Sequence, residues 1–222
     1  MKNWICRNRG LIAFVLFFGL FRTSVADWNP IPSGSMRPNL LEGDVVFVNR
    51  LAFDLKIPLS DLIVARVGEP GRGDIVTFSS PSNGTRLIKR IVALPGDTVE
   101  MRNKLVIING QQAQYIPQDT VQEPLGNGAK INAFRVSERT DREQHRIQWM
   151  PGSTARDNFG PLVVPADHFL MLGDNRDNSA DSRYFGLVPR HLLIGRAERI
   201  LVSADIQGSW LPRFDRFGQR LN

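Results

Sequence analysis

The chain has 222 residues, of which 42% are apolar and 23% charged, and its formal net charge is +6. This length supports one sizeable folded domain with room for an insertion. A basic balance suits nucleic acid or an anionic membrane surface. The sequence has no block of five Lys/Arg residues, no zinc-finger spacing and no ribonucleoprotein motif, which disfavours a nucleic-acid partner. Cys6 is the only cysteine, which excludes an intrachain disulfide.

The N-terminus combines basic residues with an apolar run at residues 11–21. A helix over residues 10–26 would be ~25 Å long, slightly shorter than the ~30 Å hydrocarbon core of a bilayer. Basic residues stay on the cytoplasmic side, so the chain after this helix would lie outside. A cleaved signal peptide is the alternative, because the Ser-Val-Ala at residues 24–26 resembles a cleavage site. Either interpretation places the bulk of the chain outside the cytoplasm.

Short runs of β-branched and apolar residues bounded by turn signals predict strands in the rest of the chain. The predicted strands cover residues 45–48, 75–78, 87–93, 98–102, 105–108, 169–172 and 194–202. Residues 51–70 are expected to form a mixed loop with at most one helical turn. The predicted fold class is mainly β: an antiparallel β-barrel-like core with an inserted β-rich lobe and one N-terminal transmembrane helix.

The same patterns divide the chain into segments. We expect a cytoplasmic basic N-terminus (1–9), a transmembrane anchor (10–26), a β core (27–110 and 161–205), a polar inserted lobe (111–160) and a C-terminal tail (206–222). The tail carries Trp210, Phe214 and Phe217 among arginines. It would form either a solvated cap or an interfacial segment near anionic lipid.

Two serines, Ser33 and Ser35, flank Gly34, with a proline on each side of the group. Proline fixes its own φ near ~−65° and disfavours helix in the residue before it, so this stretch is predicted to be a stiff, non-helical loop. A loop serine is usually only a turn residue. A rigid loop also suits a nucleophile, which must be held still and exposed.

Lys89 lies in a predicted strand that is apolar on both faces, and it shares a face with Leu87, Ile91 and Ala93. One interpretation is an edge-strand lysine that reaches water. The other is a general base. Burial that lowers its pKa from ~10.4 to ~7–8 would cost the charged form ~3–4 kcal/mol and let the amine accept a proton from serine.

Histidine and metal chemistry have less support in the sequence. His145, His168 and His191 lie in no recognisable motif, and no Gly-x-Ser-x-Gly elbow is present. No metal site and no cofactor are predicted.

The polar segment 173–186 lies between apolar flanks that would pull it against the core. Charges buried there must pair, and Asp181 with Arg183 is the natural ion pair. Ser179 could offer its hydroxyl to a neutral Lys89.

Three stretches together resemble the signature boxes of the bacterial type I signal (leader) peptidases. Residues 33–38 read Ser-Gly-Ser-Met-x-Pro, residues 88–90 read Ile-Lys-Arg, and residues 173–183 read Gly-Asp-Asn-Arg-Asp-Asn-Ser-x-Asp-Ser-Arg. The turns at 72–74 and 94–97 fit the same family. The resemblance covers about residues 10–110 and 160–205 and the tail.

The resemblance implies roles for individual residues. Ser35 would be the nucleophile and Lys89 the general base. The Ser33 hydroxyl and the Ser35 backbone N–H would hold the oxyanion, and Ser179 would orient the lysine. The remaining matched positions would support the loop or line shallow pockets for small residues; the supporting residues are Arg90, Asp174, Asp181 and Arg183, and the lining residues are Ile31 and Ile88.

The implied function is a membrane-bound serine endopeptidase, a signal peptidase I, that removes N-terminal signal peptides from exported preproteins through an acyl-enzyme. It would be single-pass in the bacterial inner membrane with its catalytic domain outside. Its partners would be preproteins emerging from the export machinery and membrane lipid. Phe185 and Asn39 depart from the family pattern, where tryptophan and threonine are frequent, and residues 111–160 match nothing assigned. A self-cleaving regulator and a non-catalytic exported β-domain of a secretion apparatus remain alternatives.

Overall fold

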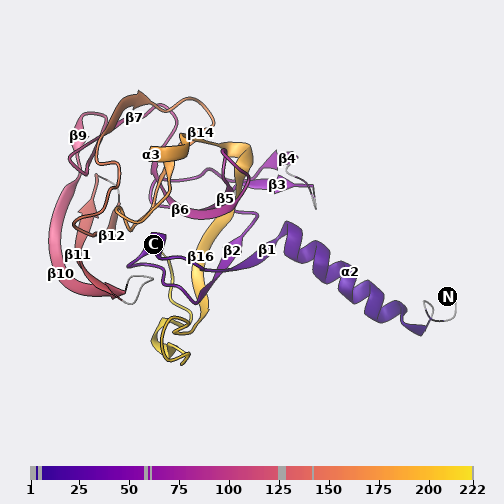
Figure 1. Cartoon of the computed structure of the whole chain (residues 1–222). Coiled ribbons are helices and arrows are strands. Elements are labelled where there is room, and N and C mark those ends of the chain that lie inside the picture. Colours follow the sequence, from indigo (N-terminus) through magenta and orange to yellow (C-terminus); the bar gives the residue numbers. More distant parts are fainter. Residues whose placement is uncertain are drawn as a thin grey trace.

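The computed structural model describes residues 4, 7–57, 60, 62–124, 129–141 and 143–221. Lys2 in the predicted basic N-terminus and the single cysteine, Cys6, lie outside these residues. The described chain is mainly β (Figure 1), which confirms the predicted fold class at that level.

The largest unit is an antiparallel seven-stranded sheet. Its order is β1 (Ala26–Pro30), β2 (Asp44–Asn49), β16 (Leu193–Ser203), β5 (Ile75–Ser79), β6 (Arg86–Ala93), β14 (His168–Leu172) and β15 (Val188–Pro189). In the described residues β1 and β15 do not pair with each other, so this sheet is open and the barrel-like prediction was wrong. The reason lies at its ends, because β15 has two residues and β1 runs directly into the serine loop.

Three smaller sheets complete the fold. One has the order β13 (Phe159–Val163), β7 (Thr98–Arg102), β8 (Leu105–Ile108) and β9 (Gln111–Gln112). The second consists of β10 (Gln114–Pro124), β11 (Lys130–Arg139) and β12 (Gln144–Trp149); we call it the lobe sheet (Figure 1). The third is the hairpin β3 (Asp54–Lys56) and β4 (Ile63–Arg66), where the sequence had predicted a loop with a helical turn.

Three apolar clusters form the core. One joins the seven-stranded sheet to β7 and β8 through residues such as Val92 and Val99. A second packs side chains of the neighbouring strands β5, β6 and β14 together with Phe53. The third places Met36 and Leu40, both fully buried, under the serine loop against β2. The loop is therefore anchored by its own apolar residues.

Helix α2 (Arg9–Ser24) extends away from the strands (Figure 1). It ends before the predicted boundary at residue 26, because Ala26 already pairs with Asn49 as the start of β1. Among the described residues, no helix is both long and apolar enough to cross a membrane.

Short helical turns connect strands: η1 (Gly34–Met36), α3 (Ser182–Phe185) and η2 (Arg190–Leu192). A further turn, η3 (Phe214–Arg216), lies in the tail after β16. The tail folds back onto the end of β16, where Arg216 pairs with the fully buried Asp44 at 2.6 Å. Trp210 and Phe214 remain more than 70% exposed on this tail.

Candidate active site

Ser35 lies in the 3₁₀ turn η1 (Gly34–Met36), so the prediction of a non-helical loop was wrong for these three residues. The flanking residues Ser33 and Arg37 are extended, and Pro38 favours this conformation in the residue before it, Arg37. Asn175 fixes the turn from outside. Its side-chain amide donates to the Gly34 carbonyl at 3.1 Å, and its backbone N–H donates to the Ser35 carbonyl at 3.1 Å.

Lys89 reaches this turn from β6. Its Nζ lies 2.6 Å from the Ser35 Oγ and 3.0 Å from the Ile88 carbonyl. Only 3% of Lys89 is exposed, and β6 pairs with β5 and β14 on its two sides. The interpretation of an edge-strand lysine that reaches water was therefore wrong. The Ser35–Lys89 spacing fits either an ammonium that donates to the hydroxyl or an amine that accepts its proton.

Burial lowers the pKa of Lys89 from 10.5 to about 8, against the opposing effect of the carboxylates of Asp181 and Asp174. A buried ammonium loses hydration, and the two carboxylates recover only part of it. At pH 7 a group with this pKa is neutral in ~10% of molecules, which suffices for a general base.

Two buried ion pairs hold the segment after β14. The Arg90 guanidinium donates to both oxygens of Asp174 at 2.9 Å. Arg183 does the same to Asp181 at 2.8 and 2.9 Å, and Asp181 also accepts from the Gly173 N–H. The predicted Asp181–Arg183 pair is thus present in the structure.

The hydroxyls of Ser179 and Ser33 form fewer hydrogen bonds than expected. The Ser179 Oγ is buried and has no hydrogen-bond partner among the described residues, so the expected bond to Lys89 is not formed. It nevertheless lies close to the site, because a Cβ built on Gly173 would be 2.2 Å from it and 2.6 Å from the Ser35 carbonyl oxygen. Ser33 is exposed at the start of the turn, and its hydroxyl forms no cap.

An apolar groove of about 380 Å³ leads to the turn. Residues 28–32 line one side and residues 86–88 with Thr77 line the other. Ile31 is buried and Ile88 half-buried in its walls. Ile88 precedes Lys89 on β6, and Ile31 lies two residues before Ser33, so an extended peptide in the groove would pass beside Ser33 and Lys89.

Comparisons with known proteins identify the family. Residues 2–202 match the family model "Signal peptidase, peptidase S26". The chain is 35% identical to signal peptidase I of Pseudomonas aeruginosa, over 92% of this chain and 75% of that protein. It is 36% identical to signal peptidase I of Pseudomonas fluorescens, with the same two coverages.

The chain belongs to the signal peptidases of family S26. It is therefore a peptidase, which sets aside the alternative of a non-catalytic β-domain. A crystal structure of a signal peptidase I from Enterococcus faecalis covers 59% of this chain and 97% of that one, at 30% identity with a TM-score of 0.35. The family assignment rests on the sequence matches.

In this signal peptidase, two residues to which the sequence assigned no role also contact the site. Asn175 holds the serine turn, and Asn39 donates to Asp174 at 2.6 Å. Asn175 lies inside the segment 173–183, whose polar composition between apolar flanks was the available signal. The His145 side chain is 8% exposed, and burial lowers its pKa to about 4, so it is neutral at physiological pH.

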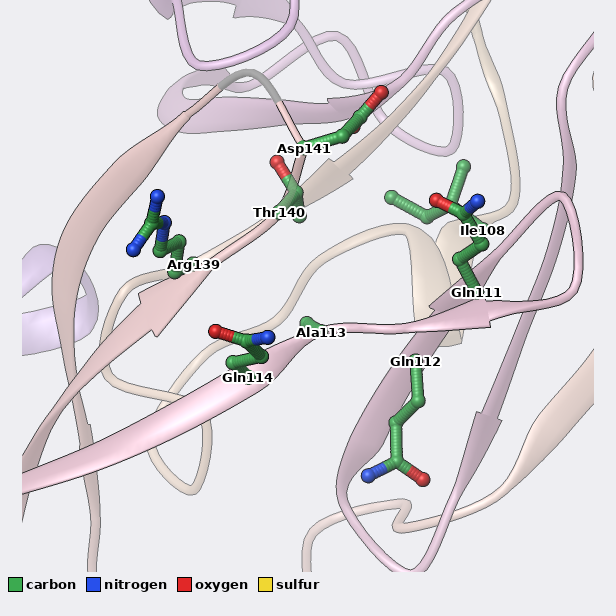
Figure 2. Close-up of a pocket in the computed structure, with 8 residues that line it drawn as sticks. All are labelled: Ile108, Gln111, Gln112, Ala113, Gln114, Arg139, Thr140 and Asp141. Carbon is green, nitrogen blue, oxygen red and sulfur yellow. The ribbon is translucent and has the colours of Figure 1, made fainter.

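A second cavity of the signal peptidase, of about 360 Å³, lies between residues 108–114 and 139–141 (Figure 2). Three glutamine side chains and Asp141 make its lining polar. None of the residues predicted for the serine site lines it.

Proposed function

We propose that this enzyme removes signal peptides from exported preproteins with a Ser35–Lys89 dyad. The observation that carries the proposal is the 2.6 Å separation between a buried Lys89 amine and the Ser35 hydroxyl. A lysine whose pKa burial has lowered to about 8 can act as a general base without a histidine or an adjacent carboxylate.

The reaction begins when neutral Lys89 accepts the Ser35 proton and the Oγ attacks the scissile carbonyl. The Ser35 N–H and the Ser33 hydroxyl stabilise the oxyanion, each donor contributing ~3–4 kcal/mol if it behaves as in comparable sites. The Lys89 ammonium then protonates the leaving amine, and an ester to Ser35 forms. Water, deprotonated by the same lysine, releases the product. Ser179 orients Lys89 once the amine is neutral.

Substrate binding uses the groove in this proposal. The preprotein lies extended along residues 28–32, and Ile31 and Ile88 limit the pockets before the cut to small side chains. The apolar lining of the groove supports this assignment. The relatives are signal peptidases I, which supports the substrate class.

The enzyme works at the inner membrane in this proposal, with residues 10–26 as the anchor and the catalytic part outside. The apolar composition of α2 and the exposed Trp210 and Phe214 of the tail support a location beside lipid. Membrane fractionation followed by extraction at alkaline pH tests it. Release of the full-length chain by alkali would refute a spanning anchor.

The activity test is preprotein processing by purified variants. Ser35→Ala and Lys89→Ala should each lower kcat by at least ~10³-fold, because the two groups act as a unit. Ser82→Ala and Lys130→Ala are the matched controls, since both side chains are exposed elsewhere. An acylating inhibitor should add its mass to the wild-type chain and not to Ser35→Ala. Normal turnover by either dyad variant would refute the assignment.

A further inference from the structure

A buried ion pair links the lobe sheet to the segment 173–183, which we call the catalytic loop. Glu138 of β11 accepts two hydrogen bonds from Arg176, at 2.7 and 2.6 Å. The two side chains are 1% and 2% exposed. The glutamate belongs to the segment that matches no family motif, and the arginine lies within the segment 173–183.

Within the lobe sheet, Tyr115 holds the Glu138 side chain in place. Tyr115 faces it across the β10–β11 register, and its hydroxyl donates to Glu138 at 2.8 Å. The same hydroxyl accepts from the Val106 N–H at 2.8 Å, which ties it to β8. His145 Nε2 lies 3.5 Å from the other oxygen of Glu138. The carboxylate is therefore oriented by a hydroxyl that β10 carries and β8 holds, before it reaches Arg176.

Arg176 is in turn built into the loop that holds Ser35. Its Nε donates to the Gly173 carbonyl at 3.2 Å. Its backbone N–H donates to Gln148 of β12, while the Gln148 N–H donates to Asp174. Between these two points lies Asn175, which holds the Gly34 and Ser35 carbonyls.

The lobe sheet also reaches the other side of the serine. Glu123 of β10, 4% exposed, pairs with Arg37, two residues after Ser35. Arg37 further donates to Glu42 at 2.7 Å. Glu123 thus contacts the residue that follows the serine turn, and Glu138 contacts the segment that holds the turn through Asn175.

A buried ion pair is a poor way to stabilise a fold, because desolvation offsets most of its attraction, whereas it fixes one geometry well. We propose that Glu138 is a positioning residue for Ser35, and that the lobe sheet acts through Arg176 to hold the loop that places the nucleophile. This inference rests on the proposed dyad. It assigns a role in catalysis to residues 111–160.

The test compares three variants of the full-length enzyme on a preprotein-derived peptide. Glu138→Gln removes the charge and keeps the shape, and Tyr115→Phe removes only the hydroxyl that orients the carboxylate. Asp119→Asn is the matched control, since this carboxylate of the lobe sheet is 51% exposed and does not contact Arg176. kcat, KM and the thermal midpoint are measured for each, with kinetics well below the midpoint.

Loss of positioning should lower kcat of Glu138→Gln by ~10- to ~100-fold and that of Tyr115→Phe by several-fold, with KM within about twofold. Asp119→Asn should match the wild type. A purely structural role would lower the thermal midpoint and leave kcat unchanged, which overturns the inference. If Glu138→Gln does not fold, Tyr115→Phe decides in the same way. A wild type that does not cleave the peptide refutes the proposed function itself.

Discussion

Arg90 and Asp174 form a two-bond ion pair on the opposite face of β6 from Lys89. Both side chains are 1% exposed, and Arg90 also donates to the Gly73 carbonyl at 2.7 Å. The pair links β6, which carries Lys89, to Asp174 at the start of the catalytic loop. The same strand therefore carries the base on one face and the attachment of the loop on the other.

Removing one member of this pair should destabilise the protein strongly. Asp174→Asn leaves the Arg90 charge buried without its counter-charge, which costs ~3–5 kcal/mol of unfolding free energy. Chemical denaturation measures it. The control is Asp167→Asn, because the Arg66–Asp167 pair is half exposed and its loss should change stability little. Equal effects of the two substitutions would contradict the argument.

The pH dependence of kcat should follow the Lys89 amine. Its pKa is lowered to about 8 by burial, so the neutral base is lost as the pH falls below that value. We expect kcat to rise with pH through an acid limb near pH 8 and then level off, provided that deprotonation limits the chemical step. A limb near pH 6.5, typical of a histidine base, would contradict the dyad.

Asp181 should affect the pH at which kcat begins to rise, because it acts on the pKa of Lys89. Its carboxylate raises the pKa of Lys89 against the effect of burial. Asp181→Asn removes this support and leaves the Arg183 charge beside the site, so both changes favour the neutral amine. The acid limb should move to lower pH while the maximal kcat falls. A limb that stays in place or moves upward would show that Asp181 does not act on the lysine.

Burial of Lys89 should also lower the free energy of unfolding at pH values where the unfolded chain carries a protonated lysine. Between pH 8 and 10.5 the unfolded chain binds more protons at this residue, so stability rises with pH there. At pH 7 the cost is ~3 kcal/mol, partly offset by ~1 kcal/mol from the bond to Ser35.

Lys89→Met should therefore raise the unfolding free energy by ~2 kcal/mol at pH 7 and leave it nearly unchanged at pH 10. Denaturation at the two pH values measures the difference. Lys130→Met, at an exposed position, should behave alike at both. Destabilisation of the Lys89 variant at pH 7 would show that the amine is not buried at a cost.

Much of the sheet follows from local sequence. The runs at 75–78 and 87–93 are apolar and β-branched, and they form β5 and β6 where predicted. The serine and lysine could be singled out because a stiff loop and a lysine in an apolar strand are locally unusual. These features depend on neighbours close in sequence, which a sequence displays.

The missed features depend on distant partners. The hairpin β3–β4 has short strands, and Arg190, 136 residues further along, binds Asp54 within it. Glu138 and Arg176 pair across 38 residues, and neither is unusual in its local sequence. The lobe strand β10 is largely exposed, so its sequence lacks the alternation of apolar and polar residues that indicates a half-buried strand. The open edge of the main sheet likewise depends on which strands fail to meet.

Gly173 offers a steric test of the whole arrangement. A Cβ there would lie 2.2 Å from the Ser179 Oγ and 2.6 Å from the Ser35 carbonyl oxygen, and the second neighbour is backbone held by Asn175. Gly173→Ala must therefore displace the serine turn from Lys89, and kcat should fall by ~100-fold or more. Gly71→Ala is the control, because its Cβ would meet only Asp74 at an ordinary 3.6 Å. Preprotein processing measures both, and wild-type turnover by Gly173→Ala would mean that the serine does not depend on the close approach of this loop.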